Sequence, residues 1–159
     1  MEDKIKNYPP SRIAQIFKEM NKKKEDAYSA NVVLPKKATP AQAPSQQVMM
    51  NAVKKRVADY SWKETPIYCY SVSEWAPQHA MIYDSTKRDS FETLTSRIMA
   101  IVAVFKKPDG SCGFMNMQIE QLNSYSAPGS LNENYVTPPT DYANSGMDPI
   151  DCAKANANK

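Results

Sequence analysis

The sequence predicts an α+β fold, in which a small antiparallel sheet with a β-hairpin at about 97–120 is flanked by two or three helices. Three observations predict it. Residues 98–105 form an unbroken apolar run, residues 106–110 have the composition of a tight turn, and residues 111–120 return with apolar and polar side chains interleaved. An extended arm precedes this unit and a polar tail follows it.

Charge and composition divide the chain into regions. Residues 1–63 carry 13 Lys/Arg and 6 Asp/Glu, a net +7, whereas residues 64–159 carry 7 and 11, a net −4, which sums to the overall +3. We predict four segments: an N-terminal helical arm at 1–34, a Pro/Ala-rich tether at 35–45, an α+β core at 46–122 and an Asn/Pro/Ser-rich tail at 123–159. A core of about 77 residues buries little apolar surface, so we expect the flanks to gain order on a partner.

The arm carries a short apolar stripe. Pro10 and Ser11 favour a helix start with Ser11 as N-cap. The stripe then follows helical spacing: Ile13, Ile16, Phe17 and Met20. Such a stripe is about two turns long and needs a surface to pack on. Two surfaces remain open for it, the groove of a partner and the protein's own sheet.

Further elements are expected between the tether and the hairpin. Ser45 favours a helix over 46–60, with one apolar side formed by Val48, Ala52, Val53, Val57 and Tyr60. Residues 67–72 are rich in β-branched and aromatic side chains and predict a strand, and residues 80–83 a short second one. A third helix is expected after Asp84, because Phe91, Leu94 and Ile98 follow helical spacing.

The two strands of the hairpin are expected to differ in environment. The first is apolar on both faces, so both must be covered. The return strand has polar residues between its apolar ones and is predicted at an edge, where Phe114, Met115 and Met117 would meet a partner. The tail after Leu122 has too few apolar residues for a core, which favours disorder in the free chain and order on assembly.

No residue pattern indicates catalysis, a cofactor or a metal. His79 is the only histidine, the three cysteines lack disulfide-scaffold or zinc spacing, and four glycines form no phosphate-binding loop. Cys69 and Cys112 are interpreted as small buried apolar residues. A Cys–His pair of either one with His79 is arithmetically allowed, so a small Cys-dependent enzyme is kept as a distant alternative.

The main functional hypothesis is a non-enzymatic structural or adaptor subunit of a larger assembly, which docks on other protein subunits or on itself through its terminal extensions. The alternative is non-specific nucleic-acid binding by a coat or packaging protein. That contact, or one with an acidic partner, would use basic clusters at Lys22, Lys23, Lys24, Lys54, Lys55 and Arg56. An anionic membrane surface bound by helix 46–60 is a more distant option. With no signal-peptide pattern and no apolar span, we expect the cytoplasm or a cytosolically assembled particle.

Overall fold

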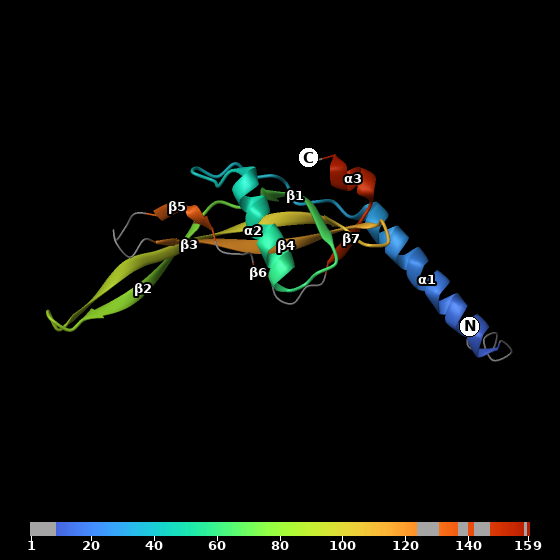
Figure 1. The fold of residues 1–159 in the computed structure, drawn as a ribbon, viewed down its shortest axis with the longest axis horizontal. Helices are drawn as coiled ribbons and strands as arrows, with labels where there is room; N and C mark the ends of the chain where they lie inside the picture. Colours follow the sequence, from blue (N-terminus) through green and yellow to red (C-terminus); the bar gives the residue numbers. More distant parts are fainter. Residues whose placement is uncertain (1–8, 124–130, 137–139, 142–146, 158) are drawn as a thin grey trace.

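The computed structural model describes residues 9–123, 131–136, 140–141, 147–157 and 159. Within these ranges, one antiparallel sheet is flanked by helices (Figure 1). The predicted α+β class is therefore confirmed. The elements are α1 (Pro10–Asn31), α2 (Gln46–Asp59), β1 (Thr65–Ser71), β2 (Ala76–Asp84), β3 (Asp89–Lys106), β4 (Cys112–Asn123), β5 (Leu131–Val136), β6 (Thr140–Asp141), β7 (Asp148–Ile150) and α3 (Cys152–Asn156).

The long strand β3 organises the sheet. Its second half pairs with β4 from Lys106↔Cys112 to Ser96↔Leu122, which confirms the predicted hairpin and extends it. The turn is closed by a hydrogen bond from the Lys107 amide to the Ser111 carbonyl, and Gly110 takes the positive φ of 84° that glycine tolerates best. On its other side β3 pairs with β1 along its second half and with β2 along its first.

The helix predicted after Asp84 is wrong, because the segment forms the first half of β3. The Asp84 carboxylate accepts hydrogen bonds from the Thr86 and Lys87 amides at 2.9 and 3.3 Å, and the chain reverses there into a hairpin. Residues 89–98 then pair with β2 in register. The helical spacing of three apolar residues is a weak local signal. Pairing with β2 determines the conformation of this segment instead.

Both faces of the sheet centre are covered, as the apolar run of β3 predicts. On one face α2 packs Met49 and Val53 into a buried cluster that also contains Cys69, Met99, Ile101, Ala103, Phe105, Met115, Met117 and Ile119. The other face holds a second buried cluster of Tyr68, Tyr70, Val102, Val104, Cys112, Phe114, Ile150 and Ala155. Alternate residues of β3 enter opposite clusters because strand side chains alternate between the two faces.

The start of α2 agrees with the sequence. The Ser45 hydroxyl accepts a hydrogen bond from the Val48 amide and caps the helix as predicted. The helix turns Met49 rather than Tyr60 into the core, since Tyr60 lies outside the helix and is exposed.

The edge position predicted for the return strand is wrong. Besides its contact with β3, β4 pairs on its other side with β7, β6 and β5, so it lies inside the sheet. Phe114, Met115 and Met117 are buried in the two clusters and offer no edge to a partner. The later strands that cover β4 come from the polar tail, where no strand pattern is evident.

The end of the chain joins the core, which reaches beyond the predicted limit at residue 122. β7 pairs Ile150 with Cys112, and this register brings Cys152 to the same end of β4, where it forms a disulfide with Cys112. The disulfide is a correction: the two residues are separated by 40 positions, and only the strand pairing makes them neighbours. The Tyr68 hydroxyl donates a hydrogen bond to the Ala155 carbonyl and fastens α3. Tyr125 and Tyr142 of the tail lie outside the described residues.

The tether lies along β1 instead of standing free. The Ala38 amide donates to the Ser71 carbonyl at 2.8 Å, and the Ser71 hydroxyl donates to the Ala38 carbonyl at the same distance. The Tyr70 hydroxyl donates to the Pro35 carbonyl at 2.9 Å. The extended Pro-rich segment therefore covers the outer edge of the sheet at β1.

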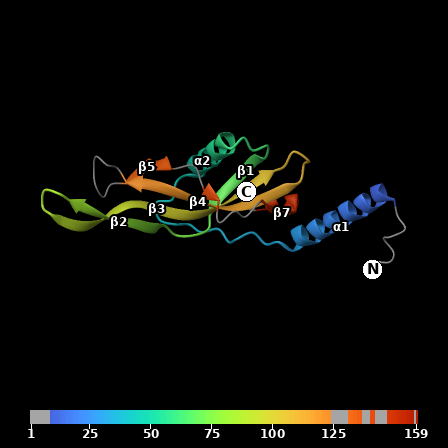
Figure 2. The ribbon, with the colours of Figure 1, turned by 90° about the horizontal axis from the view of Figure 1, so that it is seen from below.

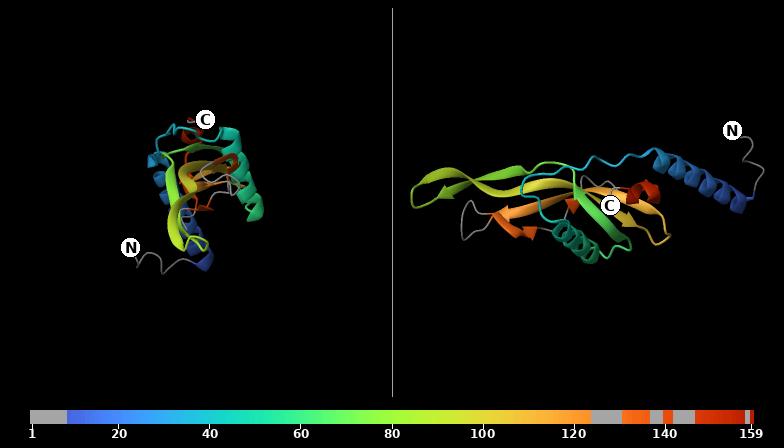
Figure 3. Two further views of the ribbon diagram at one scale, coloured as in Figure 1. Left: turned by 90° about the vertical axis from the view of Figure 1, so that its left-hand side faces the viewer. Right: turned by 90° about the horizontal axis from the view of Figure 1, so that it is seen from above.

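The molecule is elongated, with two projections at opposite ends. Helix α1 extends from the end where β7 lies, and the ribbon formed by β2 with the first half of β3 extends from the other (Figures 1 and 2). The view from above shows the same arrangement (Figure 3, right). The covered sheet centre thus separates two segments that reach away from it.

Two projecting apolar surfaces as the candidate site

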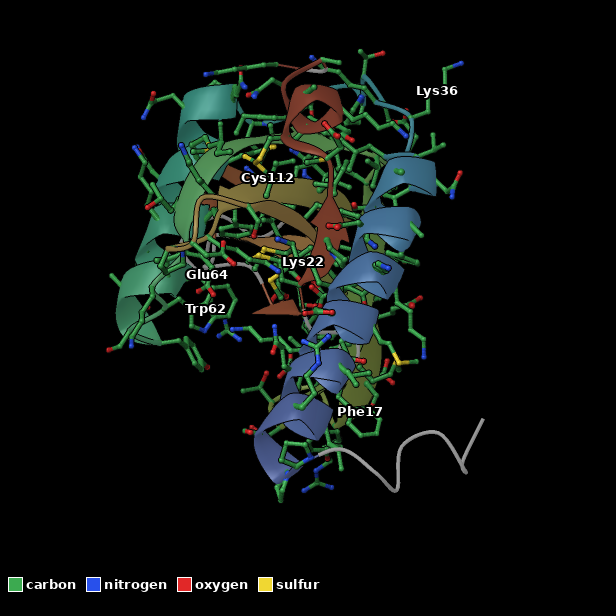
Figure 4. The ribbon with its side chains drawn as sticks, turned by 90° about the vertical axis from the view of Figure 1, so that its right-hand side faces the viewer. Phe17, Lys22, Lys36, Trp62, Glu64 and Cys112 are labelled. Carbon is green, nitrogen blue, oxygen red and sulfur yellow. A yellow bond between two sulfur atoms is a disulfide. The ribbon has the colours of Figure 1, made fainter. Side chains whose placement is uncertain are left out.

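The first candidate surface is the apolar stripe of α1, which we call the helix surface: Ile13, Ile16, Phe17 and Met20. No residue of α1 is buried, and Phe17 and Met20 are 52% and 38% exposed. Phe17 lies toward the N-terminal end of the helix (Figure 4). The described part of the chain therefore leaves Phe17 and Met20 exposed and Ile13 and Ile16 half-buried. None of the four belongs to either buried cluster of the sheet, which does not support the alternative in which the stripe packs on the protein's own sheet.

The two ends of α1 differ. Its start has Pro9 at the N-cap without a side-chain cap and Pro10 at the first helical position, so Ser11 is not the cap that the sequence suggests. Its C-terminal end is held to the body, where the Lys154 ammonium group donates a hydrogen bond to the Ala30 carbonyl. The helix is thus anchored at its root and free along the half that carries the apolar stripe.

The second candidate surface, which we call the ribbon surface, is one face of the β2–β3 ribbon. Residues directly opposite each other in an antiparallel pair share a face, which places Ile82 beside Phe91 and Asp84 beside Asp89. Ile82 and Phe91 are 44% and 49% exposed. The opposite face carries exposed Met81 and Tyr83. An isolated two-stranded ribbon is marginal in water, so a ribbon with apolar residues on both faces favours a partner.

The ribbon surface is not among the sites that the sequence predicts. A signal was present: Ala80 to Tyr83 is an apolar run of four without alternation, which in a strand puts apolar side chains on both faces. We interpreted the segment as a short strand and its return as a helix. The surface is evident only when both strands are paired.

The basic residues lie on separate elements. Lys22, Lys23 and Lys24 are exposed on α1, while Lys54 and Lys55 are exposed on α2, and the ribbon views place these helices apart. The Arg56 guanidinium is half-buried and stacks over the Tyr60 ring at 3.6 Å from its centroid. The structure therefore does not bring the two predicted clusters into one basic patch.

Lys23 and Lys24 continue the helix surface. They follow Met20 by three and four positions, so they lie one turn further along the same side of α1. By the same helical spacing, Lys22 lies on the opposite side of α1. The helix surface thus consists of an apolar patch with positive charge at one end.

The groups of the Cys–His hypothesis are apart and poorly suited to nucleophilic catalysis. Burial raises the pKa of the Cys69 thiol to about 12, which disfavours the reactive thiolate, and Cys112 is in the disulfide. His79 lies on β2 at the exposed ribbon and contacts Glu92 at 3.6 Å between Nδ1 and Oε1. Among the residues that the structure describes, no group of three His, Cys, Asp or Glu side chains is placed to hold a metal ion.

The helices within the described ranges are too short or too polar to cross a membrane. Comparison with known protein families, with curated proteins and with solved structures finds no match to this chain. A functional assignment therefore depends on the geometry of the two projecting surfaces.

Proposed function

We propose that this protein is a non-enzymatic structural or adaptor subunit of a larger macromolecular assembly, which it joins through its projecting segments. The observation that carries the proposal is the state of α1, a helix of 22 residues with none buried and with a large aromatic residue half exposed on an apolar stripe. In proteins, a helix gains most of its stability when its apolar face packs on another surface. A partner's apolar groove is the surface that such a helix fits.

The β2–β3 ribbon supports the same proposal independently. Its exposed side chains include Met81, Ile82, Tyr83 and Phe91, a dense set for a segment that covers nothing else in the described chain. They lie on both faces of the ribbon, and an apolar patch left exposed on each face is typical of a segment that binds a partner. A subunit that contacts neighbours at two ends accounts for both projections.

Non-specific nucleic-acid binding has less support. The positive charge is divided between α1 and α2, and phosphate backbones are bound best by a continuous basic groove or stripe. Treatment of the native complex with nuclease separates the two cases, because loss of the complex would favour nucleic acid as the partner.

The disulfide bears on where the protein works. Disulfides persist in oxidising environments and are rare in the cytosol. A particle that is assembled in the cytosol and then released into an oxidising medium would accommodate both the Cys112–Cys152 bond and the predicted cytosolic origin.

The test is sedimentation, under native conditions, of lysates from cells that make the full chain. We expect the wild-type protein to sediment in a heavy complex and the Phe17→Glu variant to remain near the 17.9 kDa of the single chain. Ala14→Glu is the matched control, because it introduces the same negative charge at an exposed position outside the apolar stripe and four residues before Lys18. If Phe17→Glu sediments with the complex as the wild type does, the proposal is wrong.

A further inference from the structure

The two apolar surfaces that the described residues leave exposed belong to one chain and lie at opposite ends of the molecule. The helix surface is on α1 and the ribbon surface is at the far end of the β2–β3 ribbon, with the sheet centre between them (Figure 1). Because they lie at opposite ends of the molecule, they do not meet within one copy. They meet only when two copies are placed end to end.

The two surfaces also match in chemistry. The helix surface presents Phe17 and Met20 with Lys23 and Lys24 one turn further on. The ribbon surface presents Ile82 and Phe91, again an apolar patch, with the carboxylates of Asp84 and Asp89 at one end. Lys87 of the same turn lies 3.9 Å from the Asp84 carboxylate, so Asp89 is the acidic group that faces a second copy. An apolar patch would face an apolar patch while ammonium groups would approach carboxylates.

The net charges have opposite sign. Helix α1 carries five Lys/Arg and three Asp/Glu, which is +2, whereas residues 76–95 carry two Lys/Arg and three Asp/Glu, which is −1. Opposite charge steers two surfaces together and disfavours the contact of like with like. Two helix surfaces brought together would oppose their lysines, and two ribbon surfaces would oppose their aspartates.

We propose that the partner of the helix surface is the ribbon surface of a second copy of this chain. The inference rests on the proposed function and names the partner for it. The contact is heterologous, since two different surfaces meet, and each copy keeps one surface of each kind for the next neighbour. The assembly therefore grows head to tail, into a ring if the rotation closes and a filament if it does not.

The main competing arrangement is a two-fold dimer through β2. The strand has an outer edge that no described residue covers, and residues 76–83 contain no Lys, Arg, Asp or Glu to protect it. Pairing of β2 with β2 of a second copy would leave α1 unused. The exposed Phe17 and the lysines beside it favour the head-to-tail contact, and the experiment separates the two.

The experiment uses purified full-length chain in analytical ultracentrifugation. Wild type should show species that grow with concentration beyond the dimer or close into a ring. Phe17→Glu disables the helix surface and Phe91→Glu the ribbon surface, and each variant alone should be monomeric. An equimolar mixture should form dimers and nothing larger, because one intact helix surface meets one intact ribbon surface and the remaining two are disabled.

A charge exchange provides a second, independent test. Lys24→Glu and Asp89→Lys should each weaken association, and the variant that carries both should recover it. Ala14→Glu is the control that should associate like the wild type. Circular dichroism of each variant confirms that the fold is kept, which is expected because the changed residues are exposed.

Three outcomes overturn the inference. A wild-type chain that stays monomeric at its highest soluble concentration has no self-contact. A Phe17→Glu variant that still dimerises, while Phe91→Glu does not, indicates two-fold pairing of ribbons. A mixture of the two variants that remains monomeric excludes the heterologous contact. If the purified chain is monomeric but Phe17→Glu still leaves the native complex, the partner is a different molecule and the proposed function stands.

Discussion

The sheet centre and the two projections contain the same kinds of side chain in opposite environments. Phe105 in the centre is fully buried, whereas Phe91, on the same strand, is 49% exposed. Met117 is fully buried in β4 and Met81 is 67% exposed in β2. The difference comes from what lies above the strand, since α2 and the end of the chain cover the centre and neither reaches the ribbon. Residue type thus predicts an apolar surface, and the neighbouring elements decide whether it belongs to a core or to an interface.

The largest expected difference is between the two phenylalanines of β3. Phe105→Ala should lower the free energy of unfolding by about 3–5 kcal/mol, because it removes a fully buried ring and leaves a cavity. Phe91→Ala should change it by less than about 0.5 kcal/mol in the monomer, since its ring is half in water already. Urea unfolding at low protein concentration measures both. Equal losses would mean that the ribbon packs on something in the free chain.

The next largest change in unfolding free energy is expected from the disulfide, which joins the start of β4 to the start of α3. Replacing Cys112 and Cys152 with serine opens a loop of 40 positions and should lower the free energy of unfolding by about 2–4 kcal/mol. A reductant should lower the urea midpoint of the wild type and leave that of the double variant unchanged. An identical midpoint for reduced and oxidised wild type would contradict a closed bond in solution.

A smaller change in unfolding free energy is expected from replacing the serine near the start of each long helix, and the two replacements should differ. Ser45→Ala removes the hydroxyl that accepts from the Val48 amide and should cost about 1 kcal/mol of unfolding free energy. Ser11→Ala lies inside α1, where it caps nothing, and should cost none, because alanine is the better helix former. Thermal unfolding of the two variants checks this. A loss at Ser11 as large as that at Ser45 would place the start of α1 later in the chain.

The smallest effect is expected at the tip of the ribbon. Hydrogen bonds from the Thr86 hydroxyl and amide lower the pKa of Asp84 below its usual 3.8. Because the pKa of this carboxyl group is lower in the folded chain than in the unfolded chain, its ionised form stabilises the turn at a pH above the unfolded-state pKa. That stabilisation is lost as the pH falls through the folded-state pKa. The Thr86 amide shift in two-dimensional NMR should titrate below pH 3.8, while the sheet centre does not respond. In Asp84→Asn that titration should vanish, and a wild-type midpoint above 3.8 would contradict the turn.

Local signals in the sequence predicted a good part of the covered centre. The serine before the apolar side of α2, the Pro-Asp-Gly turn at 108–110 and the apolar run before it each act over a few residues, and all three were confirmed. The helix surface of α1 was also identified from spacing alone. Its exposure was not, because two alternatives for covering it were equally open in the sequence.

The errors share a cause, which is pairing between distant segments. Helical spacing predicts a helix for the first half of β3, although β2 pairs with it across the turn at Asp84. Met117 was placed at an edge, although the polar tail adds strands to β4. The Cys112–Cys152 bond had no spacing signal, since the register of β7 creates it.

The sequence by itself determined the helices at the two ends of the tether, the β3–β4 hairpin and the apolar character of both sheet faces, because capping, turn chemistry and side-chain periodicity act between near neighbours. Only the tertiary structure decided which strands are interior, that the last residues close the core, and that α1 and the ribbon project beyond the cover of the other described elements. Those outcomes depend on the register between paired strands and on the closure of long loops. A sequence carries no local signal for which distant strand will pair.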